Sequence, residues 1–123
     1  MDCTVKRTSR IPTGSSVPLL ARLVDGVTES PITAAQIQTV ALRIVDMKTK
    51  AATTPAISDP SEVIKSLTAW SKDEIGYNFR YDAKPAELVA GDRVYQYQFT
   101  FTPADVSAQP FKLVIEVPTF EIG

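Results

Sequence analysis

The feature that most constrains the fold is a strict alternation of aromatic and polar residues in the segment VYQYQFTFTP. Tyr95, Tyr97, Phe99 and Phe101 alternate there with glutamine and threonine residues. Successive side chains of a β-strand point to opposite faces, so this segment is predicted to be a strand with one aromatic and one polar face. A second layer must cover the aromatic face, because a sheet buries its apolar side against another element. The segment therefore predicts a layered β protein.

The same period of two recurs along most of the chain, and helical periodicity is nearly absent. About seven runs are predicted as strands, namely Val5 to Ile11, Val17 to Val24, Val40 to Met47, Val63 to Leu67, Gly76 to Tyr81, Val94 to Thr102 and Phe111 to Ile122. A tight turn is expected at Asp25-Gly26, and short helical turns within ESPITAAQIQ and at Ala86 to Val89. This pattern predicts an all-β fold, an antiparallel β-sandwich of the immunoglobulin-like or jelly-roll type.

Two segments in the middle of the chain are less regular. Residues 48–60, KTKAATTPAISDP, lack apolar alternation and are predicted to form a long loop, which is a candidate contact surface because loops of this length are often functional. In the run that follows, Val63, Leu67 and Trp70 are spaced like a helix face, whereas the β-branched residues and Pro60 are compatible with a strand. We prefer the strand.

The length of 123 residues corresponds to one domain. We expect an N-terminal arm over residues 1–12 and a single β-sandwich domain over residues 13–123, because Gly14, Ser15 and Ser16 are typical of a linker. The first ten residues, MDCTVKRTSR, lack the apolar stretch of a signal peptide, and no run has the about 20 apolar residues of a spanning helix. We therefore expect a protein that is made in the cytoplasm and has no membrane partner.

The composition excludes much catalytic chemistry. The chain has no His and one Cys, so histidine-based triads, the usual zinc sites and an internal disulfide are all absent. With 13 basic and 14 acidic side chains interspersed, no nucleic-acid surface is expected. Cys3 has no His partner and is interpreted as incidental. We expect no catalytic residue, no cofactor and no bound metal.

Two groups of residues allow a functional as well as a structural interpretation. Asp73 and Glu74 resemble paired carboxylates of a glycosidase, but neighbours in a strand point apart, so we expect a polar turn without catalytic role. The aromatic residues suggest either a carbohydrate-binding platform that uses Trp70 or a sandwich core, and their alternation favours the core. They are Trp70, Tyr77, Phe79, Tyr81, Tyr95, Tyr97, Phe99 and Phe101.

The candidate partner contacts are three cations near the N-terminus, Lys6, Arg7 and Arg10. On an arm they would anchor the chain to an acidic partner surface, although a solvated terminus explains them equally well. The polar residues Gln96, Gln98, Thr100 and Thr102 offer a second possible interaction surface, for which we prefer a solvated sheet face.

Three stretches together resemble a known group of proteins. They are SVPLLARLVDGVTESPITAAQIQTVALRIVD, TAWSKDEIGYNFRYDAKPAEL and VYQYQFTFTPADVSAQPFKLVIEVP, which cover most of the chain from Val17 to Val117. The opening VPLLARLVD, the ITAAQI segment, the GYNFR strand and the Tyr/Phe strand ending in FTPA resemble small virion-associated proteins of tailed phages, of the head cement or decoration type. More weakly, they resemble the immunoglobulin-like N-terminal domain of phage upper baseplate proteins.

The resemblance implies a non-enzymatic structural component of a virion. A capsid cement or decoration protein is the first expectation, and a neck, tail or baseplate protein is the alternative. The implied partners are the major capsid protein or tail and neck proteins, together with further copies of the chain in a homo-oligomer. We also expect the C-terminal strand edge or the N-terminal arm to be available for strand addition to a neighbour.

Overall fold

The computed structural model describes residues 3–8, 10–23, 32–57, 59–70, 73–89 and 91–121. Within these ranges the strands are β1 Cys3–Arg7, β2 Ile11–Pro12, β3 Val17–Ala21, β4 Ile37–Asp46, β5 Ala52–Thr53, β6 Ile64–Trp70, β7 Asp73–Ala83, β8 Val94–Pro103 and β9 Phe111–Phe120. The short 3-10 turns are η1 Ala34–Gln36, η2 Pro60–Glu62 and η3 Pro85–Glu87. The predicted all-β class is confirmed, as are the strand that we preferred after Pro60 and the helical turn within ESPITAAQIQ.

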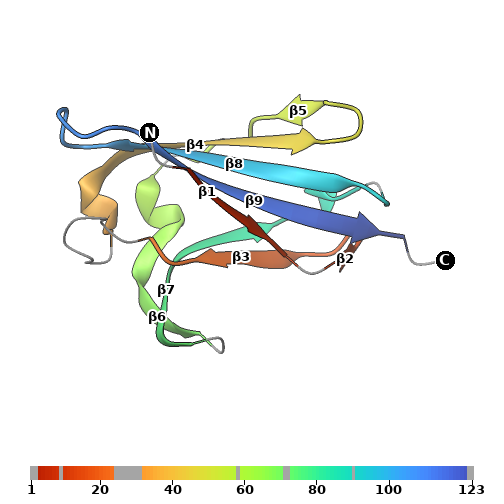
Figure 1. Ribbon diagram of the computed structural model, residues 1–123, viewed down its shortest axis with the longest axis horizontal. Coiled ribbons are helices and arrows are strands. Elements are labelled where there is room, and N and C mark those ends of the chain that lie inside the picture. The colour runs from red at the N-terminus through yellow and green to blue at the C-terminus, as the bar shows by residue number, and fades with distance from the viewer. Residues whose placement is uncertain are drawn as a thin grey trace.

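The strands form two sheets that pack face to face, seen from the side in Figure 1. The larger sheet has the order β1-β9-β8-β4-β5, with β2 also paired to β9, and the smaller sheet has the order β3-β7-β6. β3, β7 and β6 correspond in order to strands B, E and D of the immunoglobulin fold, and β4, β8 and β9 to strands C, F and G. Of the two expected sandwich types, the connectivity is therefore immunoglobulin-like.

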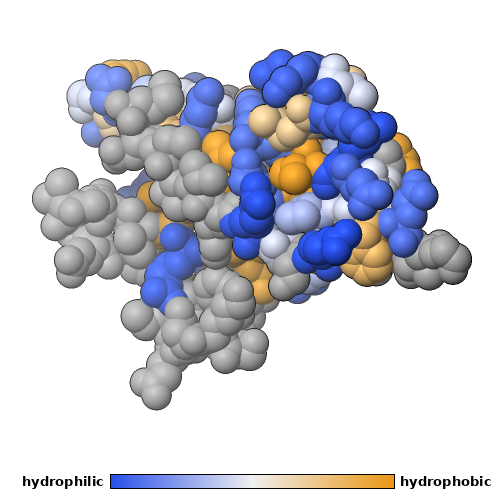
Figure 2. Space-filling model, turned by 45° about the vertical axis from the view of Figure 1, so that its right-hand side comes forward, coloured by the Kyte–Doolittle hydropathy of each residue, from blue (hydrophilic) through white to orange (hydrophobic). Residues whose placement is uncertain are grey.

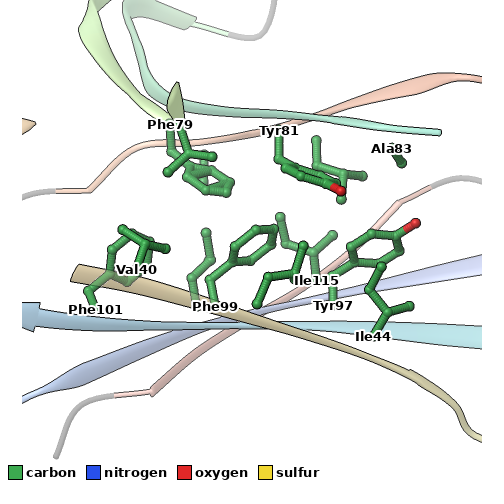
Figure 3. Close-up of a cluster of buried hydrophobic side chains, with 14 of the residues drawn as sticks. Val40, Ile44, Phe79, Tyr81, Ala83, Tyr97, Phe99, Phe101 and Ile115 are labelled. Atoms are coloured by element: carbon green, nitrogen blue, oxygen red, sulfur yellow. The ribbon is translucent and has the colours of Figure 1, made fainter. Parts of the chain in front are cut away.

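Aromatic rings from both sheets fill the core (Figure 3). The ring centroids of Phe79 on β7 and Phe99 on β8 are 4.8 Å apart at an interplanar angle of 73°, the edge-to-face geometry that aromatic pairs favour. Six of the eight aromatic residues singled out in the sequence are buried, namely Phe79, Tyr81, Tyr95, Tyr97, Phe99 and Phe101. The predicted aromatic core is confirmed for these six; the side chains of Trp70 and Tyr77 lie outside the described part.

The N-terminal segment differs from the expected arm. β1 pairs in parallel with β9 from Cys3 opposite Lys112 to Arg7 opposite Glu116, and β2 continues on the same strand with Ile11 opposite Thr119. β9 therefore has a neighbour on each side, and its edge is not open for strand addition as we had expected. Pairing between the two ends of a chain has no local signal, which is why the sequence did not reveal it.

Pro118 explains the break between β1 and β2. The carbonyl groups of Glu116 and Phe120 accept hydrogen bonds from the N-terminal segment, through the amides of Thr8 and Thr13. Alternation along β9 directs the backbone nitrogen of Pro118 to the same side, where a proline has no N–H to donate. Arg7 lies opposite Glu116 and Ile11 lies opposite Thr119. Between these two pairs the N-terminal segment advances by one residue more than β9 does.

Two further expectations are modified, and a third lies outside the described part. Residues 48–60 are not wholly a loop, because Ala52 and Thr53 form β5 against the end of β4. Asp73 and Glu74 lie at the start of β7 rather than in a polar turn. β7 begins at Asp73, three residues before the predicted start at Gly76. The Asp25-Gly26 turn lies outside the described residues.

Asn78 on β7 holds the two ends of the connection between β3 and η1. Its side chain is only 1% exposed. Its Oδ1 accepts a hydrogen bond from the amide of Leu23 at 2.6 Å, and its Nδ2 donates to the carbonyl groups of Leu23 and Ile32 at 2.8 and 2.9 Å. The amide of Ile32 also donates to the carbonyl of Leu23. A buried amide thus satisfies backbone groups that no strand partner reaches.

Candidate protein-interaction surface

The side of the larger sheet that points away from the core carries an ordered set of mostly polar side chains, here called the outer face. Its members alternate along their strands with residues of the core, and the strand register aligns them in three rows. The first row is Val45, Gln96, Glu116 and Arg7; the second is Arg43, Gln98 and Val114; the third is Ala41, Thr100 and Lys112. Strand alternation thus places the predicted polar side of β8 in the middle of the outer face.

Hydrogen bonds join the first two rows across β1, β9 and β8. Arg7 donates to Glu116 Oε1 from Nη2 at 2.9 Å and from Nε at 3.2 Å. Gln96 Nε2 donates to Glu116 Oε2 at 3.4 Å, and Gln98 Nε2 donates to Gln96 Oε1 at 2.5 Å. The Arg7 side chain is 59% exposed, so its ion pair with Glu116 contributes at most about 1 kcal/mol to stability. The main effect of this chain of contacts is to fix the polar groups relative to one another.

Two apolar residues lie beneath these polar groups. Val45 and Val114 belong to the outer face by position, yet each is only 7% exposed and neither belongs to the core cluster. Val114 is paired with Gln98, and Val45 with Gln96. Amphipathic side chains commonly cover apolar neighbours with their methylene groups, and the long side chains paired with Val45 and Val114 are of that kind. The outer face thus combines exposed polar groups with two buried valines.

The structure separates the three cations that the sequence singled out. Arg7 belongs to the outer face, whereas Arg10 lies at β2, with its guanidinium carbon 5.2 Å from the centroid of the Phe120 ring and its Nη2 3.7 Å from Asp92 Oδ1. The backbone of Lys6 pairs with Ile115, and its side chain lies outside the described part. Arg7 and Arg10 each have an acidic partner within the chain, so they do not form one unpaired cationic cluster.

Asp46 ties the end of β4 to the start of β8. Its carboxylate accepts hydrogen bonds from the amides of Lys48 and Thr49 and, at 2.6 Å, from Arg93 Nη1. Burial opposes ionisation of Asp46, but these donors outweigh it and hold the pKa of the carboxyl below its ordinary value. This contact links the two strands at one end of the outer face. The described surface visible in Figure 2 is mostly hydrophilic, with smaller hydrophobic areas between.

Glu87 joins the two sheets at the connection between β7 and β8. Tyr81 and Tyr97 donate hydrogen bonds from their hydroxyl groups to Glu87 Oε2 and Oε1, at 2.7 and 3.1 Å. Burial and the neighbouring carboxylate raise the pKa of both phenols, so they remain protonated donors. Because both hydroxyl donors and both carboxylate oxygens have partners within the chain, this cluster is a structural contact.

Other kinds of site find no support in the described ranges. No three His, Cys, Asp or Glu side chains come together there as a possible metal site. None of the helical turns in the same ranges is long and apolar enough to cross a membrane. The side chains of Asp73, Glu74 and Cys3 lie outside the described part, so their predicted lack of a catalytic role stays a prediction.

Comparisons with protein family models, characterised proteins and solved structures find no match to this chain. The outer face is therefore argued from its own geometry. The alternation of β8 predicted that Gln96 and Gln98 share a polar face. The pairing of Arg7 with Glu116, which are 109 positions apart, had no sequence signal. Only the parallel contact of β1 with β9 brings these two side chains together.

Proposed function

We propose that this chain is a non-enzymatic structural component of a phage virion and acts as a capsid cement or decoration protein. A neck, tail or baseplate position is the alternative within the same class. In either position the chain binds other virion proteins through the outer face. The observation that carries the proposal is the chain of hydrogen bonds from Arg7 through Glu116 and Gln96 to Gln98, which holds a broad polar surface in one arrangement before any partner binds.

Three further points support this proposal. The resemblance to small virion proteins extends from Val17 to Val117. The weaker resemblance, to the N-terminal domain of phage upper baseplate proteins, implied an immunoglobulin-like sandwich, and the strand order agrees with that type. The carbohydrate-binding alternative needs exposed rings. Six of the eight aromatic side chains that suggested it are buried, and those of Trp70 and Tyr77 lie outside the described part. Repetition on a lattice also allows a modest affinity per copy to give firm attachment, because many contacts act together.

The experiment that tests the proposal is quantitative mass spectrometry of gradient-purified particles of a phage whose genome encodes this chain. A copy number comparable to that of the major capsid protein is expected for a decoration protein. A small, fixed copy number instead supports the neck, tail or baseplate position. Absence of the chain from particles, while it is abundant in the infected cell, would refute a virion role.

A further inference from the structure

The outer face carries two cations that no acidic side chain neutralises. Arg43 on β4 and Lys112 on β9 form no ion pair with any residue in the described part of the chain, whereas Arg7, Arg10, Arg80 and Arg93 each have an acidic partner. The one acidic side chain in the three rows of the outer face is Glu116, and Arg7 already holds it. The outer face therefore has an excess of positive charge in a chain whose net charge is −1.

The positions of these cations indicate the kind of ligand. Gln98 separates Arg43 from β9 in the second row, and Thr100 separates Lys112 from β4 in the third. Two strand spacings and an offset of two residues put the Cα atoms of Arg43 and Lys112 roughly 12 Å apart. At that separation Arg43 and Lys112 can each contact a different carboxylate on one acidic surface. The amide and hydroxyl groups between them offer uncharged hydrogen-bonding partners.

We propose that the outer face binds an acidic surface of a different virion protein, with Arg43 and Lys112 contacting carboxylates of that partner. This inference rests on the proposed virion function and adds the chemistry of the partner. A nucleic acid fits less well, because binding to phosphates draws on clustered Lys and Arg, and only two unpaired cations are present in the described part of this face. A second copy packed face to face offers only Glu116, which is already paired with Arg7.

The test compares two variants with equal changes in net charge, R43Q/K112Q and the control K48Q/K84Q. Lys48 and Lys84 are exposed and lie outside the outer face. Lys48 is in the turn that follows β4, and Lys84 directly precedes η3. Each purified protein is added to particles that were produced without the chain, and bound copies are measured over a range of concentrations. We expect R43Q/K112Q to raise the apparent Kd about tenfold and K48Q/K84Q to leave it within about twofold. Added salt should weaken binding of the wild type more than that of R43Q/K112Q.

A zero-length carbodiimide cross-link supplies a second readout, because it joins an amine to a carboxylate only at contact distance. We expect Lys112 to be linked to Asp or Glu of another virion protein.

Equal binding of R43Q/K112Q and wild type, with unchanged unfolding midpoints, would overturn the inference and leave the proposed function standing. Failure of the wild type to bind particles refutes the proposed function and the inference together. Binding to double-stranded DNA, or self-association, that requires Arg43 and Lys112 would overturn the assignment to an acidic protein surface.

Discussion

Replacing Asn78 tests how the connection between β3 and η1 is held. Asn78→Ala removes three hydrogen bonds at 2.6, 2.8 and 2.9 Å. At about 1 kcal/mol of net stability for each, the expected loss in the free energy of unfolding is about 3 kcal/mol, a large part of the roughly 5–15 kcal/mol of a typical domain. The measurement is urea unfolding followed by far-UV circular dichroism. Asp82→Ala is the control, because Asp82 is exposed on the same strand and its ion pair with Arg80 is a surface one, so the expected loss is below about 1 kcal/mol.

The near-isosteric change Asn78→Asp separates hydrogen bonding from packing. It replaces the Nδ2 donor with an oxygen that faces the carbonyl groups of Leu23 and Ile32, so the carboxylate form is repelled. The folded-state pKa of the introduced carboxyl then lies above its unfolded value, and the variant gains stability as pH falls, since the native state binds more protons. A loss below about 0.5 kcal/mol for Asn78→Ala, or a pH-independent deficit for Asn78→Asp, would refute the reasoning.

Three other predictions test contacts elsewhere in the sandwich. Tyr97→Phe keeps the ring but removes one donor to Glu87, so the free energy of unfolding should fall by about 1 kcal/mol in urea titrations; an unchanged value would show that this hydrogen bond adds nothing. The lowered pKa of Asp46 means that its contribution to stability is present above the unfolded value, near 3.8, and is lost as pH falls through the folded value. Thermal unfolding between pH 2 and 6 should therefore show a steeper acid loss for the wild type than for Asp46→Asn, and parallel curves contradict this. Deletion of residues 1–12 should lower the unfolding midpoint and promote self-association in light scattering after size exclusion, because it uncovers one edge of β9; a monomer of unchanged stability would argue against that role of the segment.

Much of the fold could be predicted because strand signals are local. Alternation in Val94 to Thr102 identified both the strand and the side that faces the core, and Tyr97 and Phe99 are both buried there. The strand after Pro60 was ambiguous in sequence because its apolar spacing fitted two periods. Tertiary packing decided between them, since β6 pairs with β7 at the edge of the smaller sheet.

The candidate site could be predicted only in part. Gln96 and Gln98 were placed on one polar face from their spacing alone, and Arg7 was singled out for its charge. The sequence pattern did not associate Arg7 with Glu116, or Asn78 with Leu23 and Ile32. These contacts join residues from 46 to 109 positions apart, so no local periodicity reports them.

The sequence by itself determined an all-β sandwich with an aromatic interior. Side-chain alternation is a property of each strand, and the aromatic face of a strand is buried against a second sheet because removing large apolar rings from water is favourable. The tertiary structure alone decided that the N-terminal segment joins the larger sheet beside β9, that the connectivity is immunoglobulin-like, and that Arg43 and Lys112 remain unpaired on the described part of the outer face. The physical reason is that strand order and charge pairing depend on which distant segments become neighbours. That choice is made by the packing of the whole chain.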